Sequence, residues 1–277
     1  TIVSGNSVFE VEDTQKKLGD LFVHYGSVKT GEIKINDVVE MKIDVERRNN
    51  LKAYHSATHL LHESLRRTLG KHVMQKGSLV APDRLRFDFS HMKPITNEEL
   101  ETIDKLVNEY VKNGSEVTTR IMTPKAAIEK GALAFFGEKY GEEVRVVSMG
   151  KEKDAYFSTE LCGGTHVKNT GDIGKFKTVS QSSIAAGVRR VEALRDKQLE
   201  DFIKNKEKLS TLSVQKDEET IKDLSSQIIK LGGKPKVDNK DLKEIIKNLS
   251  KQLEQLNVNS VLQDKTKNII NDQKIKD

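Results

Sequence analysis

The spacing of apolar residues changes twice along this 277-residue chain, and that change sets the strongest limit on its fold. Residues 1–50 carry short apolar or alternating stretches broken by glycines, which is typical of short strands and turns. Residues 51–195 mix strand-like and helical spacing, whereas residues 196–277 carry leucine and isoleucine at helical spacing. We therefore predict an α+β chain in three parts: a partial N-terminal β-barrel, a central domain and a C-terminal helical extension.

The first part is predicted to hold strands near residues 8–11, 32–35 and 38–43, with a turn at Asn36-Asp37. The pattern starts as though in the middle of an element, and the first residue is threonine rather than methionine. We therefore expect the chain to be a piece of a longer protein.

Helices of the central part are recognised by their ends. Apolar residues at helical spacing over 53–69, followed by Gly70, predict the first helix. Thr96 and Glu99 form a capping box for a second helix, which Gly114 ends. The other expected elements are a short helix between residues 123 and 131 and strands near 79–80, 84–89, 116–122, 144–149, 156–161, 175–180 and 188–194. The sheet is expected to be largely antiparallel, with the helices packed on it.

The last part is predicted to be two helices, over 196–231 and 241–256, separated by a Gly-Gly-Lys-Pro sequence at 232–235. We expect an antiparallel helical hairpin or coiled coil, with residues 257–277 frayed. Residues 196–277 hold 17 lysines and 15 acidic residues, a net of +2 (17 − 15). Such balance favours a solvated helix face over an RNA-binding patch.

Charge and cysteine content limit the function classes. The formal net charge of +5 permits a polyanionic partner such as RNA without establishing one. No apolar run approaches the roughly 18 residues that a membrane helix needs, and residues 1–10 lack the pattern of a signal peptide. We therefore predict no membrane partner. The single cysteine, Cys162, excludes a disulfide within the chain and fits a cytoplasmic location.

Four residues have the spacing of metal ligands. His55 and His59 are four apart in a predicted helix, so both rings lie on one face and can hold one ion. Taken alone, such a pair is as often a pair of structural histidines as a metal site. Cys162 and His166 are separated by two glycines, which permit a tight loop. One sulfur and three nitrogens suit zinc best, and we predict one zinc ion per chain.

Four protein ligands normally make a closed structural site, which counts against catalysis unless one ligand is absent or displaced. His62, three residues past His59, is near the same helix face and competes as a ligand. His72 and His91 lack such spacing and are expected to be ordinary surface or core histidines.

Longer motifs surround these candidate ligands. They lie at residues 13–16, 55–61, 72–80, 84–91, 136–141, 161–166 and 187–190. Over residues 8–195 they resemble the editing domain of alanyl-tRNA synthetases and of their free-standing relatives, the AlaX proteins. The threonyl-tRNA synthetase editing domain is similar around the histidine pair, but the Cys-Gly-Gly-Thr-His form points to the alanine branch. The extended motifs resemble the bacterial-type synthetase more than a short AlaX protein.

The resemblance implies zinc-dependent hydrolysis of the ester bond of mischarged Ser-tRNA(Ala) and Gly-tRNA(Ala). An alanine pocket rejects glycine or an added hydroxyl only weakly, by ~10²-fold, so a second hydrolytic site is needed. The bound zinc is expected to position the substrate or polarise water. The resemblance also places Thr58 and Gln75 in the pocket, although Thr58 could simply bond its own helix and Gln75 could face solvent. Because no ATP-binding, amino-acid-activating domain precedes residue 1, we expect no aminoacylation by this chain.

The expected RNA contact is the acceptor end of tRNA(Ala). Arg189 and Arg190 are the first candidates, but in a strand they point to opposite faces, so only one is expected to touch RNA. Lys76, Arg84 and Arg86 are weaker candidates. The C-terminal helices resemble the start of the synthetase's oligomerisation and tRNA-binding region, so self-association through them is a further expectation.

Three alternatives stay open at this point. One is a free-standing AlaX-type trans-editing protein, and another is a structural-zinc module that binds tRNA or assists oligomerisation. The third, a general nucleic-acid-binding protein with long helices, is disfavoured by the resemblance. Deacylation of mischarged tRNA separates the zinc module from the enzyme.

Overall fold

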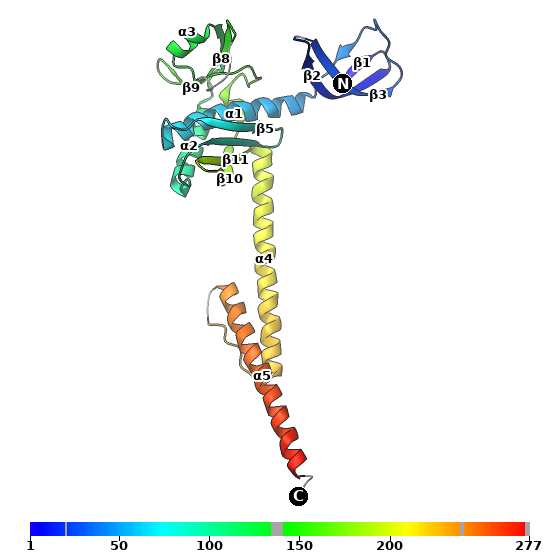
Figure 1. Ribbon diagram of the computed structural model, residues 1–277, viewed down its shortest axis with the longest axis vertical. Helices are drawn as coiled ribbons and strands as arrows, with labels where there is room; N and C mark the ends of the chain where they lie inside the picture. Colours follow the sequence, from blue (N-terminus) through cyan, green and yellow to red (C-terminus); the bar gives the residue numbers. More distant parts are fainter. Residues whose placement is uncertain (20, 134–140, 239–240, 275–277) are drawn as a thin grey trace. The chain divides into compact units, whose positions relative to one another are not determined.

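This computed structural model describes residues 1–19, 21–133, 141–238 and 241–274 (Figure 1). The chain divides into two compact units, Thr1–Leu199 and Glu200–Asp277. Most of the motif at 136–141, namely residues 136–140, lies outside the described residues.

The strands all belong to the first unit. They are β1 (Ile2–Ser4), β2 (Ser7–Lys17), β3 (Leu21–Thr30), β4 (Glu40–Met41), β5 (Gln75–Val80), β6 (Leu85–Ser90), β7 (Thr118–Met122), β8 (Val144–Lys151), β9 (Tyr156–Leu161), β10 (Phe176–Ala185) and β11 (Val188–Arg195). The helices are α1 (Val45–Leu69), α2 (Asn97–Asn113), α3 (Pro124–Glu129), the 3-10 helix η1 (Thr170–Ile173), α4 (Asp196–Lys230) and α5 (Leu242–Lys274).

The N-terminal strands form a four-stranded antiparallel sheet in the order β3-β2-β1-β4. Its outer strands, β3 and β4, do not pair, and no closed barrel is found among the described residues, so the predicted partial barrel is not confirmed. The strand predicted at 32–35 is wrong. Asp37 instead accepts a hydrogen bond from the backbone N–H of Lys34 at 2.7 Å, which closes the turn predicted at Asn36-Asp37.

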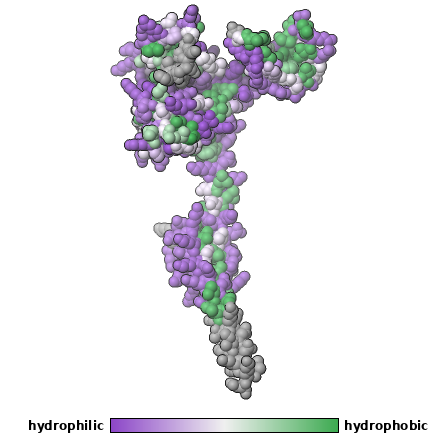
Figure 2. All heavy atoms as spheres, viewed as in Figure 1, coloured by the Kyte–Doolittle hydropathy of each residue, from purple (hydrophilic) through white to green (hydrophobic). Residues whose placement is uncertain are grey.

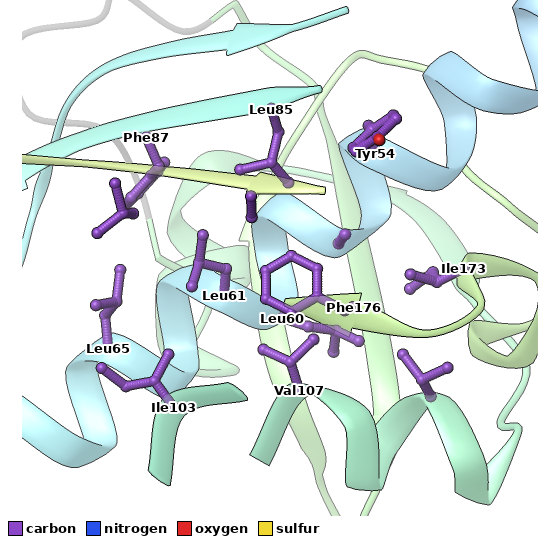
Figure 3. Close-up of a cluster of buried hydrophobic side chains, with 14 of the residues drawn as sticks. Tyr54, Leu60, Leu61, Leu65, Leu85, Phe87, Ile103, Val107, Ile173 and Phe176 are labelled. Carbon is purple, nitrogen blue, oxygen red and sulfur yellow. The ribbon is translucent and has the colours of Figure 1, made fainter. Parts of the chain in front are cut away.

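The central sheet has the order β10-β11-β6-β5, and a second sheet has the order β7-β8-β9; both are antiparallel. Alternation in β6 turns Leu85, Phe87 and Phe89 into the core, where all three are fully buried. Figure 3 shows Leu85 and Phe87 facing the side chains of α1 and α2, including Leu61 and Ile103. The core therefore holds α1 firmly between the sheets and α2.

Helix ends agree with the cap signals more closely than with apolar spacing. The capping box of Thr96 and Glu99 is present at the start of α2, and Gly114 ends that helix with a φ of 58°. Helix α1, however, begins well before the predicted residue 53. Asp44 caps it by accepting a hydrogen bond from Arg47 N at 2.9 Å, and its first turns are too polar to show apolar periodicity.

The C-terminal unit confirms two long helices but not their expected arrangement. The second half of α4 packs on α5 through Ile228, Ile245 and Leu249. Figure 1 shows the two helices running in the same direction, so the antiparallel hairpin was wrong. The described part of the connection, residues 231–238, lies beside α5 and is tied to it by a 2.8 Å hydrogen bond from Gln252 to Lys234 O.

Helix α5 also continues to Lys274, so the predicted fraying from residue 257 is wrong for the backbone described there. Among the described residues, no helix combines the length and apolar character needed to cross a membrane.

Candidate metal centre

Two distant segments meet at one point of the first unit. Helix α1 carries His55 and His59 one turn apart, and the loop after β9 carries Cys162 and His166. One ligand atom from each of the four residues lies within 4.8 Å of all the others. The Sγ atom of Cys162 is 3.5 Å from Nε2 of His55 and 3.3 Å from Nε2 of His166. The structure thus brings together all four residues that the sequence spacing nominated.

The loop at 162–166 is fitted to the helix by Gly164 and held in place by Arg145. A Cβ atom at Gly164 would lie 2.2 Å from Cε1 of His55, so only glycine lets the loop approach the ring. Arg145 of β8 donates hydrogen bonds to the carbonyls of Cys162 and Gly164. These bonds fix the loop on the edge of its own sheet.

Two polar side chains orient the imidazoles from behind. Nδ1 of His59 is 2.7 Å from Oε2 of Glu160, and Nδ1 of His166 is 3.1 Å from Oγ of Ser56. A partner at Nδ1 sets the tautomer and aims Nε2 at the centre of the cluster. Such outer partners are a regular feature of metal-binding histidines.

The electrostatics of the cluster favour an anionic sulfur. Burial opposes ionisation of Cys162, but hydrogen bonds from His166 and His55 lower the pKa of its thiol to about 3. Burial likewise works against a charged His59, yet the Glu160 carboxylate raises the pKa of that imidazole to about 10. Burial lowers the pKa of His166 to about 4. The thiolate of Cys162 and the neutral ring of His166 are forms that bind metal, whereas binding of a metal at Nε2 of His59 would release a proton from that ring.

The donor set passes a test of fit for zinc. Nε2 of His59 is buried and has no hydrogen-bond partner among the described residues, although it faces three other donor atoms. A metal ion would satisfy this nitrogen. One sulfur and three imidazole nitrogens make a set that zinc accepts in tetrahedral geometry.

A cavity of about 120 Å³ opens beside the cluster. It is lined by His55, Thr58, His59, His62, Gln75, Ser78, Phe87, Glu160 and Cys162. Both predicted substrate contacts therefore reach it. The Thr58 hydroxyl also donates to Tyr54 O at 2.8 Å, so its proton is committed to its own helix.

Sequence reasoning missed Glu160, Ser56, Ser78, Phe87 and Arg145. One signal for Glu160 was available, because it precedes Cys162 by two residues at the end of a strand and so shares its face. No spacing rule identifies the others. His62 lies outside the four-residue cluster, although it lines the same cavity.

The cationic side chains predicted to contact RNA differ in their exposure and in their ion pairs within the chain. Arg190 makes a two-pronged ion pair with Asp88, at 2.7 and 2.8 Å, and Arg86 lies 3.7 Å from the same carboxylate. Arg189 is half-buried and reaches Gln181 at 3.4 Å. The other two cations, Arg84 and Lys76, are exposed, and Arg84 pairs with Asp83 at 3.0 Å. His72 and His91 contact each other at 2.9 Å.

Comparison with known proteins agrees with this site. The family described as threonyl and alanyl tRNA synthetase second additional domain matches residues 144–192, which include Cys162 and His166. An alanine–tRNA ligase from Parvibaculum lavamentivorans is 48% identical over 245 residues, covering 87% of this chain. The chain spans only 28% of the length of that relative. These two matches identify the chain as a homologue of part of the alanyl-tRNA synthetases.

Proposed function

We propose that the chain is an editing module that hydrolyses the ester bond of Ser-tRNA(Ala) and Gly-tRNA(Ala). The observation that carries the proposal is the meeting of three imidazoles and one cysteine sulfur beside a small cavity. His55, His59, Cys162 and His166 would hold one zinc ion. The relation to alanine–tRNA ligases supplies the substrate class.

The cavity suits a small aminoacyl group. A water molecule occupies about 30 Å³ in the liquid, so a cavity of about 120 Å³ holds a group of a few heavy atoms. Glycine and serine fit such a space, and so does alanine. Selectivity against alanine must therefore come from polar groups such as Thr58 and Gln75 rather than from size.

The chemistry is divided between the ion and the chain. When bound, zinc supplies Lewis acidity toward water or the ester carbonyl. Glu160 and Ser56 keep the ligand imidazoles in one orientation. The Thr58 oxygen can accept a hydrogen bond from the substrate, and the Gln75 amide can both donate and accept one.

Lys76 is the best-placed cation for the tRNA acceptor end. It is exposed and follows Gln75 directly, at an irregularity in the pairing of β5 with β6. Arg190 is paired with Asp88, so we assign it a role in stabilising the sheet rather than in binding RNA. Phosphate contacts of this kind position the substrate and weaken with salt.

Self-association through the C-terminal unit is part of the proposal. Apolar residues reach the surface along α4 (Figure 2), where Leu209 is 67% and Leu212 is 51% exposed. Lysine at both positions should lower the mass found by sedimentation equilibrium if α4 forms the contact. An unchanged mass would reject this contact.

Single-turnover deacylation tests the enzyme assignment directly. The chain should hydrolyse Ser-tRNA(Ala) and Gly-tRNA(Ala) but spare Ala-tRNA(Ala), and a chelator should stop the reaction until zinc is restored. The competing candidate is a structural-zinc module, which the four protein ligands favour. Zinc and tRNA binding without any deacylation would establish that module and reject the enzyme.

A further inference from the structure

His62 is a buried histidine that the proposed metal site leaves unexplained. It follows His55 by seven residues and His59 by three on α1, so the three rings share one helix face. Its side chain is 5% exposed, and its ring packs against Phe87. Nε2 of His62 has no hydrogen-bond partner among the described residues, yet the residue lines the cavity beside the cluster.

Glu160 fixes the tautomer of His62 in the same way as that of His59. Its Oε2 is 2.7 Å from Nδ1 of His59, and its Oε1 is 3.0 Å from Nδ1 of His62. A carboxylate only accepts hydrogen bonds, so both Nδ1 atoms must carry the protons. In its neutral form, a ring with the proton at Nδ1 presents a lone pair at Nε2. In His59 that lone pair is available to a metal ion, whereas His62 lies outside the four-residue cluster.

A buried acceptor without a donor is unfavourable, so the Nε2 atom of His62 calls for a partner from outside the chain. The Thr58 oxygen is a second, weaker acceptor at the cavity, because its own proton is already donated to Tyr54 O. The donors that an aminoacyl ester can bring into a small cavity are its amino group and, in serine, its hydroxyl. Alanine brings no hydroxyl.

We propose that His62 is a specificity-determining residue whose Nε2 accepts a hydrogen bond from the serine hydroxyl of the substrate. The proposal rests on the editing function proposed above. Alanine in the same cavity leaves Nε2 unpaired, which should favour serine roughly tenfold or more. Glycine leaves room for a water molecule at that place, so it escapes the same penalty.

Two substitutions of His62 distinguish the role of Nδ1 from the role of Nε2. In His62→Asn the amide nitrogen takes the place of Nδ1 and keeps a donor for Glu160, but nothing replaces Nε2. In His62→Gln the amide reaches toward the position of Nε2 and restores a polar atom there. His91→Asn is the matched control, because His91 contacts His72 and is not among the residues that line the cavity.

The measured quantity is the ratio of kcat/KM for Ser-tRNA(Ala) over Ala-tRNA(Ala), with zinc content and Tm recorded for each variant. We expect His62→Asn to lower the ratio roughly tenfold, His62→Gln to recover part of it and His91→Asn to leave it unchanged. Binding of the seryl and alanyl amides of 3′-amino-3′-deoxyadenosine should show the same loss of preference without turnover.

Spectroscopy of the unaltered chain covers the case in which His62→Asn does not fold. With ¹⁵N-labelled histidine, the Nε2 resonance of His62 should shift on adding the seryl amide and not on adding the alanyl amide. Equal shifts, or an unchanged ratio in a zinc-loaded His62→Asn variant, would mean that a water alone satisfies Nε2 and would overturn the proposal. If the unaltered chain deacylates nothing but binds the seryl amide through His62, the hydrolytic function fails instead.

Discussion

Gly164 lies so close to the ring of His55 that a Cβ atom at Gly164 would be 2.2 Å from Cε1 and 2.7 Å from Nδ1 of that ring. The loop after β9 and helix α1 therefore fit together with no spare space at this point. Neighbouring Gly163 has nothing within 4 Å of the corresponding position. The two glycines thus have different roles, although they are adjacent in one motif.

Replacing Gly164 by alanine should weaken zinc binding, because the added methyl group must push the His55 ring or the loop out of place. Disturbing the support of a metal ligand typically costs 10–100-fold in metal affinity, and we expect a loss of about that size. Competition with a chelator of known affinity measures it. Gly163→Ala is the control and should bind zinc almost normally; equal losses in both variants would contradict the packing described here.

The sequence could nominate the four candidate ligands because residue type and spacing suffice for that. A pair of histidines four apart on a helix must share a face. A cysteine and a histidine separated by two glycines can reach the same metal ion from a tight loop. For Glu160 the sequence offers only its place two residues before Cys162, which does not assign it a role. Its role depends on the distance between β9 and α1, which no local pattern encodes.

The fold shows the same division between local and non-local information. Both ends of α2 could be predicted from Thr96, Glu99 and Gly114, because a helix cap depends only on residues close together in the sequence. The alternation over 32–35 predicts a strand wrongly, because the Asp37 carboxylate accepts a hydrogen bond from Lys34 N and the chain turns there. The direction of α5 depends on contacts such as the one between Lys234 and Gln252, and helical periodicity carries no information about them.

Glu160→Gln should reduce zinc affinity by roughly 10–100-fold. A carboxylate accepts from Nδ1 of both His59 and His62, whereas an amide can accept from only one of them and offers a donor to the other. Metal content after dialysis against a chelator measures the effect. Glu98→Gln, on the first turn of α2, is the control, and a Glu160→Gln variant that keeps its zinc as well as this control would disprove the orienting role.

The pair of Asp88 and Arg190 should make stability depend on pH in the acid range. Hydrogen bonding to the Arg190 guanidinium holds the pKa of Asp88 below its ordinary value of 3.8. A lowered pKa in the folded state stabilises the fold above the unfolded value, and that gain disappears as the pH falls through the folded value. Asp88→Asn should therefore lower the Tm of zinc-free protein at neutral pH, with a difference that shrinks below about pH 4. A difference that stays constant with pH would rule out this linkage.

The C-terminal unit should be dispensable for hydrolysis, since every candidate site residue precedes it. The structure places the boundary after Leu199, which is 1% exposed and belongs to the first unit. A chain ending at residue 199 should keep single-turnover deacylation at saturating tRNA. A chain ending at residue 195 should be less stable by about 2 kcal/mol, because it lacks the buried Leu199 side chain. If the longer variant folds and yet hydrolyses nothing, the tail takes part in the chemistry.

Selectivity for serine over alanine should depend on Thr58 and Gln75, because alanine is small enough to enter the cavity. Both residues line the cavity, and the Thr58 oxygen can accept a hydrogen bond although its proton is given to Tyr54 O. An unmet buried hydrogen bond costs ~1–3 kcal/mol, which corresponds to a preference of roughly ten- to 150-fold. Thr58→Val and Gln75→Ala should each shrink the ratio of Ser-tRNA(Ala) to Ala-tRNA(Ala) hydrolysis while zinc content stays unchanged. Thr58→Ser keeps the oxygen and is the control. If both variants retain the full ratio, the hydroxyl is read by other groups, and the assignment of the four metal ligands is unaffected.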